Sequence, residues 1–243
     1  MKMHLGLAAV LGVGLSVALA TPATAAGATI NVPDDFVTAL SDTRATGHFE
    51  VVGTGLRVWT ESNTSTDKVA EYVATDTPLA AAGEPALQYS ATTGGAPGFQ
   101  LVVDFDGNGT ADGILVGEPG VYGNDWWLNN AAQQFVKVGA PSHTGGSGSA
   151  NHGTLDGWRT AFPDAQVVAF GFSLGSGVKG DGVLTAIDFA GTSYTFAQHT
   201  VLTGKDQCKN GGWATSTKPV YKNQGDCVSG FASVKSSGKL LVK

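Results

Sequence analysis

The sequence has few charged residues, few cysteines and no long apolar run after its first 25 residues. Only 14% of its 243 residues are Asp, Glu, Lys or Arg, whereas glycine occurs 35 times. Long solvated helices need more charge than this, so the composition indicates many turns between short strands. Because 42% of the residues are hydrophobic, the chain can form a sizeable core and is not of the disordered class.

Basic residues are scarce in the largest part of the chain. Residues 26–203 contain six Lys and Arg against eighteen Asp and Glu, whereas residues 204–243 contain seven Lys against two Asp. The acidic part disfavours nucleic acid as a partner, since phosphates need Lys and Arg, and it suits divalent cations. The Lys-rich end is interpreted as a solubilising tail; contact with an anionic cell-envelope polymer is the alternative.

The longest apolar run lies near the first residue and is too short to cross a bilayer comfortably. Lys2 precedes it, residues 5–18 are uncharged, Pro22 interrupts the run, and residues 23–25 read Ala-Thr-Ala. This is the pattern of a signal peptide, here of bacterial type. We therefore expect residues 1–25 to be removed and the rest to be secreted, without a transmembrane segment.

Cysteine occurs twice, as Cys208 and Cys227. An isolated pair in a secreted chain most often forms a disulfide, and a metal site would need further Cys or His nearby. This bond would contribute about 3 kcal/mol to the stability under the chain-entropy model. Because the composition also changes near Gly204, we expect residues 26–203 to form one domain and residues 204–243 a small segment with one disulfide.

Short β-like runs separated by Gly, Asn, Asp and Pro predict the architecture. Residues 154–162 have apolar residues at helical spacing, with Thr154 at the start and Pro163 after the end, and predict one short helix. So many short strands with so little helix indicate an all-β protein, an antiparallel β-sandwich of jelly-roll type. The predicted strands are residues 48–52, 56–60, 69–73, 86–90, 99–103, 113–116, 134–138, 166–174, 183–189 and 193–196.

A nine-residue Asp-rich segment is the sharpest local motif. Residues 104–112 have oxygen-bearing side chains at relative positions 1, 3, 5 and 9 and a glycine at position 6. This resembles the first nine positions of an EF-hand-type calcium loop, so structural Ca²⁺ is the expected cofactor. Position 12 is Leu115 instead of Glu, and a hairpin turn that uses Asp and Asn for their turn chemistry is the alternative. The predicted ligands are Asp104, Asp106, Asn108, Thr110 through its carbonyl, and Asp112.

Residues 171–175 match Gly-x-Ser-x-Gly, the nucleophile elbow of serine hydrolases, with Ser173 at the centre. Asp181 or Asp188, followed by His199, would complete the usual order of a catalytic triad. An elbow must lead from a strand into a helix, however, and residues 175–182 are too rich in glycine to form one. We therefore interpret the segment as a strand followed by a β-turn.

A glycosidase would instead need two carboxylates facing each other across a cleft. The sequence does not pair the available ones, Glu50, Glu61, Glu71, Glu84 and Glu118. The histidines show no metal-ligand spacing and are expected on the surface or in loops; they include His48, His143, His152 and His199.

Residues 122–130 combine aromatic rings with amides and a carboxylate, the groups that sugar sites use. Neighbouring side chains of a strand point to opposite faces, so at most one of the two adjacent tryptophans faces the core. We expect the other to be half-buried or open to a ligand. The predicted ligand-binding residues are Tyr122, Asn124, Asp125, Trp126 and Trp127.

Three phrases within residues 99–196 resemble exported bacterial proteins of unknown function. They are Leu-Val-Val-Asp-Phe-Asp-Gly at 101–107, Gly-Asn-Asp-Trp-Trp at 123–127 and Gly-Phe-Ser-Leu-Gly-Ser-Gly at 171–177. Residues 205–228 look like a short cysteine-pair ending found on assorted secreted bacterial proteins. The resemblance implies export and a lectin-like β-sandwich, and it brings no catalytic residue.

The sequence thus favours a secreted, non-catalytic β-sandwich protein that binds a glycan or another cell-envelope polymer and carries structural calcium. A secreted hydrolase acting on polysaccharide or ester substrates is the alternative. A purely structural surface protein, with neither ligand nor turnover, is the third class.

Overall fold

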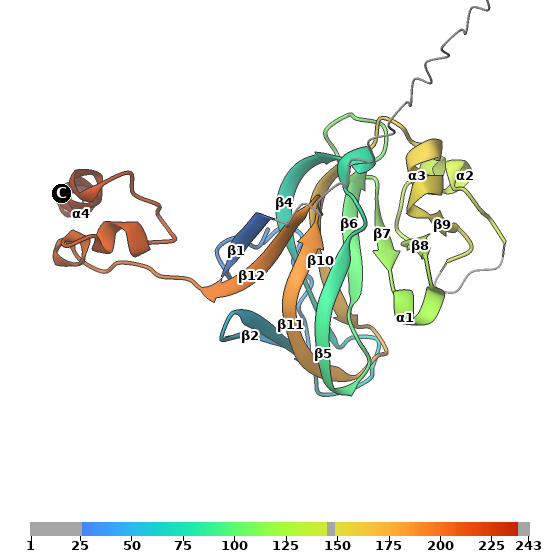
Figure 1. The fold of residues 1–243 in the computed structure, drawn as a ribbon, viewed down its shortest axis with the longest axis horizontal. Coiled ribbons are helices and arrows are strands. Elements are labelled where there is room, and N and C mark those ends of the chain that lie inside the picture. The colour runs from blue at the N-terminus through green and yellow to red at the C-terminus, as the bar shows by residue number, and fades with distance from the viewer. Residues whose placement is uncertain (1–25, 145–148, 238–243) are drawn as a thin grey trace, which may run out of the picture.

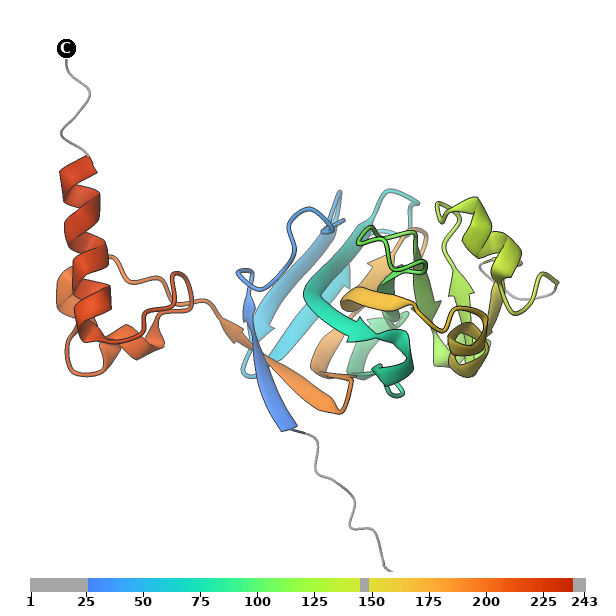
Figure 2. The same cartoon turned by 90° about the horizontal axis from the view of Figure 1, so that it is seen from above.

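Two β-sheets of six strands each form the body of the protein (Figure 1). The computed structural model describes residues 26–144 and 149–237, so the predicted signal peptide lies outside the described residues. The all-β, two-sheet architecture predicted from the turn pattern is confirmed. A C-terminal segment follows the last strand, at the opposite end of the sandwich from the short helices α2 (Gln134–Gly139) and α3 (Leu155–Ala161) (Figures 1 and 2).

The first sheet has the order β1-β12-β11-β3-β2, and β5 also pairs with β11. Its strands are β1 (Ala26–Val32), β2 (Gly47–Val52), β3 (Gly55–Thr60), β5 (Ala86–Gly94), β11 (Gly180–Phe189) and β12 (Thr192–Gln198). All of these pairs are antiparallel except β1 with β12, which is parallel. The predicted antiparallel β-sandwich is therefore confirmed, and β1 with β12 is its one parallel pair among the described strands.

The second sheet has the order β4-β10-β6-β7-β8-β9, and its last four strands follow one another along the chain. Its strands are β4 (Lys68–Pro78), β6 (Gly98–Asp104), β7 (Gly113–Gly117), β8 (Asp125–Leu128), β9 (His152–Thr154) and β10 (Gln166–Gly175). The connections between these consecutive antiparallel strands lie at the two ends of the sheet, and the longest, residues 129–151, joins β8 to β9. The Asp-rich segment is one of these loops, between β6 and β7.

The core lies between the two sheets and is built from alternate residues of their strands. Leu56 and Leu184 of the first sheet belong to the same buried cluster as Leu101, Phe170 and Phe172 of the second. β6 is buried on both faces. The segment before β2 covers the outer face of the second sheet, where Leu40 packs against a cluster that includes Val102. This cover explains why Leu101, Val102 and Val103 are all apolar although neighbouring side chains of a strand point to opposite faces.

Helices are more numerous than the single one predicted. The expected helix is α3 (Leu155–Ala161), where the Thr154 hydroxyl accepts a hydrogen bond from the backbone N–H of Gly157. Residues 134–138, predicted as a strand, lie instead in a helix with Val136 buried, so that prediction is wrong. The other helical elements are α1 (Pro119–Tyr122), α2 (Gln134–Gly139), α4 (Gln224–Ser237), η1 (Leu79–Ala81), η2 (Lys205–Cys208) and η3 (Gly212–Thr215).

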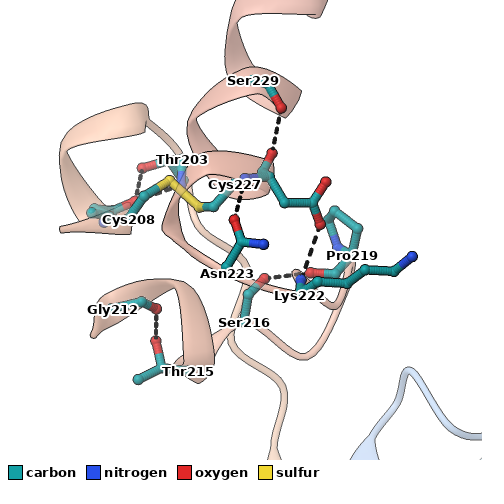
Figure 3. The surroundings of a disulfide bond; sticks show 12 residues. Thr203, Cys208, Gly212, Thr215, Ser216, Pro219, Lys222, Asn223, Cys227 and Ser229 are labelled. Atoms are coloured by element: carbon teal, nitrogen blue, oxygen red, sulfur yellow. Dashed lines mark hydrogen bonds between the residues drawn. A yellow bond between two sulfur atoms is a disulfide. The ribbon is translucent and has the colours of Figure 1, made fainter. Parts of the chain in front are cut away.

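The C-terminal segment has a small core of its own around a disulfide (Figure 3). Cys208 of η2 and Cys227 of α4 are bonded, with their Cα atoms 5.8 Å apart, as the sequence predicted. Both are fully buried, and Trp213 and Phe231 pack against them. This bond is consistent with folding in an oxidising compartment. Within the described part of the chain, no helix is long and apolar enough to span a membrane.

Candidate functional site

The Asp-rich loop joins β6 to β7 and gathers three carboxylates at one point. Asp104 ends β6, Asp106 lies in the turn, and Asp112 immediately precedes β7. One oxygen atom from each lies within 4.8 Å of the other two. Asp104 and Asp112 are buried, whereas Asp106 is exposed. The carboxylates are thus arranged as a ring open to solvent on one side, a geometry that can hold a metal ion.

Backbone N–H groups orient the buried carboxylate at the start of this loop. Asp104 Oδ1 accepts hydrogen bonds from the N–H groups of Gly107 and Asn108 at 2.8 and 3.2 Å, and its Oδ2 accepts from Gly109 at 2.7 Å. Gly109 has φ of +88°, which a glycine adopts readily. This is the relative position 6 for which the motif predicts a glycine.

The same hydrogen bonds set the charge of Asp104. Burial opposes ionisation of its carboxyl, but the N–H groups of Gly109, Gly107 and Asn108 outweigh burial and hold the pKa below its ordinary value. Asp104 is therefore a carboxylate at neutral pH. Each carboxylate oxygen has two lone-pair directions, so Oδ2, with one N–H bound, can still accept a cation.

Asp112 also keeps an oxygen for a cation. Its Oδ2 accepts from the backbone N–H of Phe105 at 2.8 Å, which holds the side chain toward the loop and leaves Oδ1 without a partner among the described residues. The side-chain oxygen of Asn108 accepts from the N–H of Thr110 at 2.8 Å, so these two predicted ligands are part of the same turn. The loop is both a hydrogen-bonded turn and a cluster of hard oxygen atoms, and the two interpretations of the sequence are compatible.

The twelfth position of the motif contributes nothing to this cluster. Leu115 is fully buried in β7. Glu118, the nearest later carboxylate, lies beyond the opposite end of β7, where its Oε2 accepts from the Trp127 indole N–H at 3.1 Å. The loop therefore presents three carboxylates without the bidentate Glu that strengthens an EF-hand site.

The two adjacent tryptophans of β8 point to opposite faces, as predicted. Trp126 is 7% exposed and packs in the main core near Phe99, with ring centroids 5.9 Å apart. Trp127 is half-buried on the other face and donates to Glu118. The Trp126 side chain therefore packs inside the sandwich, whereas the Trp127 side chain lies on the opposite face of β8.

A cavity of about 310 Å³ lies beside Trp126, where β5 of one sheet faces the second sheet. Of the five predicted ligand-binding residues, Asn124 and Trp126 line it and the other three do not. Its remaining walls are mainly apolar, and two glutamates, Glu84 and Glu118, belong to the lining. The sequence offered no signal for β5 as the opposite wall, because nothing in residues 86–89 indicates which strand they face.

Two glycines make room for the side chains of this cavity. A Cβ added to Gly117 would lie 2.8–2.9 Å from three atoms of the Trp126 ring, and one added to Gly98 would lie 2.8 Å from Glu118 Cγ. Such distances are shorter than van der Waals contact, so any larger residue would displace these side chains. The positions of Trp126 and Glu118 therefore depend on glycine at residue 117 of β7 and at residue 98 of β6, respectively.

The remaining aromatic-segment residues have other surroundings. Tyr122 ends α1 and is half-buried. Asp125 accepts from His152, with 2.6 Å between Oδ2 and Nδ1, while His152 Nε2 lies 2.9 Å from the carbonyl oxygen of Thr144. The His152 side chain is 12% exposed and His152 begins β9, so the expectation of a surface or loop histidine is wrong here. Sequence reasoning missed this pair because 26 residues separate its members.

The Gly-x-Ser-x-Gly segment is strand followed by turn, as predicted. Ser173 lies inside β10, paired with Ala70 of β4 and Gly98 of β6. Gly175, Ser176 and Gly177 all have positive φ and turn the chain toward β11 instead of starting a helix.

The acidic and histidine residues considered as triad partners are engaged elsewhere. Asp181 pairs with Arg57, Asp188 accepts from Gln88, and His199 lies 3.2 Å from Asp34. These contacts do not assemble a triad around Ser173.

Comparisons with protein-family models, with curated proteins and with solved structures find no match. The geometry of the Asp-rich loop and of the cavity beside Trp126 therefore carries the functional argument.

Proposed function

We propose that this chain is a secreted, non-catalytic β-sandwich protein that binds a glycan or another cell-envelope polymer and carries a structural Ca²⁺ ion. The observation that carries the calcium part is the ring of Asp104, Asp106 and Asp112, with oxygen atoms within 4.8 Å of one another. Hard oxygen ligands suit Ca²⁺. Because three carboxylates repel one another, a divalent cation stabilises the loop that holds them.

The role of the ion follows from where the loop lies. Residues 104–112 join two neighbouring strands of the second sheet, and the other end of β7 leads to Glu118 and the cavity. An ion at the loop fixes the β6–β7 hairpin and does not itself reach the cavity. With the bidentate Glu absent, we expect a dissociation constant on the order of 0.1–1 mM, as in extracellular modules.

A thermal melt with calcium and with a chelator tests this part. A ligand at 100 times its dissociation constant adds about 2.7 kcal/mol to the free energy of unfolding, which raises the melting temperature by several degrees. Magnesium at the same concentration is the control for ionic strength, since it prefers a tighter octahedral site. Equal melting temperatures in calcium and chelator would rule out a calcium role.

The glycan part is supported by the residues around the cavity. Trp126 and Tyr89 supply aromatic rings, and Asn124 and Glu118 supply planar polar groups. Sugars present apolar ring faces and hydroxyls, so they need both kinds of group. A glycan array and a polysaccharide pull-down with calcium present test this part, and the absence of any binding would refute it.

A hydrolase is the second candidate, because Glu84 and Glu118 line the same cavity. Glycosidases use two carboxylates on opposite sides of the bond that they cleave. Glu118→Gln and Glu84→Gln, with Ser173→Ala for the ester alternative, separate the functions. Loss of turnover with retained fold in any of these variants would establish an enzyme.

A further inference from the structure

The cavity beside Trp126 is partly enclosed and is not a flat binding face. β5 of the first sheet supplies Leu87 and Tyr89 as one wall, and the second sheet supplies Phe99 and Trp126 as the other. Its volume of about 310 Å³ is at the lower end of the range for small-molecule sites, roughly 300–1,000 Å³. A cavity of this size accepts the end of a chain and not a long stretch of polymer.

The charged residues that line the cavity are all acidic. Glu84 and Glu118 are the charged residues that line it, and no Lys, Arg or His is among its lining residues in the described part of the chain. Glu84 is 81% exposed and paired with Arg159 at 3.1 Å, so solvent and this partner screen it. Glu118 is half-buried and has no basic partner among the described residues. It is therefore the carboxylate that a ligand in the cavity meets.

Glu118 retains hydrogen-bonding capacity toward a ligand. Its Oε2 accepts from the Trp127 N–H, which fixes the side chain, and its Oε1 has no partner among the described residues. The Trp126 indole N–H likewise donates to no described residue, and Asn124 is exposed at the rim. A ligand with one cationic donor and several hydroxyls matches these groups.

We propose that this cavity binds the end of a glycan that carries a free amine, an amino sugar, with the ammonium at Glu118 and the apolar face of the sugar against the Trp126 and Tyr89 rings. The inference rests on the proposed glycan-binding function and adds the chemical class of the ligand. Neutral sugars lose the charge-assisted hydrogen bond to Glu118. Uronic acids and phosphate-bearing polymers meet two carboxylates and no cation, so they are excluded.

Calorimetric titration of the full chain in calcium with four probes tests the proposal. The probes are a short glucosamine oligomer, its N-acetylated counterpart, a uronic-acid oligomer of the same length, and N-α-acetyl-lysine amide. We expect the glucosamine oligomer to bind at least tenfold more tightly than the N-acetylated one and the uronic acid not to bind. The lysine derivative should bind weakly, because it lacks the sugar ring.

Glu118→Gln is the decisive variant. A glutamine keeps an oxygen that can accept from Trp127, so the fold and the rings are retained, but the negative charge is lost. The preference for the amine should fall to less than threefold, while binding of the N-acetylated oligomer should change little. Glu61→Gln is the matched control, since Glu61 is exposed and lies outside the cavity. It should leave the preference unchanged.

The outcomes separate this inference from the proposed function. If all sugar probes bind equally, or if the amine preference survives Glu118→Gln, glycan binding stands and the amino-sugar inference is wrong. If the lysine derivative binds as tightly as the oligomer, the amine is recognised without its sugar and the inference is also wrong. If no glycan binds here or on an array, both the inference and the glycan function fall.

Discussion

The Asp125 carboxylate in β8 and the His152 imidazole in β9 are hydrogen-bonded at 2.6 Å, and the other imidazole nitrogen faces the Thr144 carbonyl. Both partners can only accept, so the arrangement needs a proton on each ring nitrogen. The hydrogen bond to Thr144 and the charge of Asp125 raise the pKa of His152 above 6.5 against the opposing effect of burial. The pair thus stabilises the β8–β9 edge in its protonated form.

This gives a stability that depends on pH. Because the pKa is raised in the folded state, the stabilisation is complete below the unfolded value of 6.5 and is lost as pH rises through the folded pKa. The denaturation midpoint in urea should therefore decrease as the pH is raised above 6.5. His152→Asn should remove this part of the dependence. His143→Asn, which changes an exposed loop histidine, should preserve it, and equal pH profiles for the two variants would contradict the prediction.

The proposed calcium site in the Asp-rich loop can be tested one carboxylate at a time. Asp112→Asn removes one of the three negative charges while keeping an oxygen for the Phe105 N–H, so calcium affinity should fall about tenfold or more and the apo protein should be little changed. Asp76→Asn, at an exposed position on β4, is the control. Calcium titrations followed by melting temperature check this. An unaltered calcium response in Asp112→Asn would mean that the ion, if bound, lies elsewhere.

The packing of Trp126 over Gly117 predicts an overpacking penalty. Gly117→Ala places a methyl group within 3 Å of the indole ring, so the ring must move, at a cost of about 1–3 kcal/mol in the free energy of unfolding. Gly120→Ala, where a Cβ meets nothing within 4 Å, should cost much less. Urea unfolding measures both. Similar stabilities of the two variants would mean that the Trp126 ring moves without cost, which would contradict this prediction.

Tyr89 offers a substitution that should not destabilise. Its hydroxyl is the one buried side-chain polar atom of the described residues without a hydrogen-bond partner. Burial of the ring also raises its pKa, so the hydroxyl stays protonated. Tyr89→Phe should leave stability unchanged or raise it by up to about 1 kcal/mol. A loss above this size in a urea melt would mean that an ordered water satisfies the hydroxyl.

Loss of the disulfide should destabilise the C-terminal segment more than it destabilises the sandwich. Replacing Cys208 and Cys227 together by Ser removes a cross-link worth about 3 kcal/mol under the chain-entropy model. The small cluster around it, with Trp213 and Phe231, should open and become sensitive to protease. Cleavage should fall within residues 204–237, and the sandwich should retain its melting temperature. A lowered melting temperature of the whole chain would contradict this independence.

Most strands could be predicted because a period of two and a glycine-rich turn leave a local trace. Residues 48–52 and 56–60 alternate around Gly53-Thr54-Gly55 and form the β2–β3 hairpin as expected. The Asp-rich turn was predicted for the same reason, since all of its oxygen-bearing side chains lie within nine residues. Features of this kind depend on neighbours in sequence, which pattern analysis can see.

The secondary-structure predictions fail where contacts with residues distant in the sequence determine the structure. Residues 134–138 are β-like in composition, but they pair with no strand and form a helix whose buried Val136 belongs to the main core cluster. β1 has a weak pattern and forms because β12 offers a parallel edge. α4 contains two glycines and was not predicted; Asn223 caps its start, and Cys227 and Phe231 anchor one face. The contribution of β5 to the cavity wall could not be predicted for the same reason, because it depends on a contact with a distant strand.

The place of β1 at the end of the first sheet has a consequence for proteolytic processing. Residues 26–32 occupy the hydrogen-bonding side of β12. Cleavage after residue 25 would preserve that cover, whereas cleavage after residue 32 would leave the amides and carbonyls on the β1-facing side of β12 unpaired. Such a bare strand recruits strands from other molecules. Loss of residues 26–32 would thus expose a strand edge along which copies of the chain could associate.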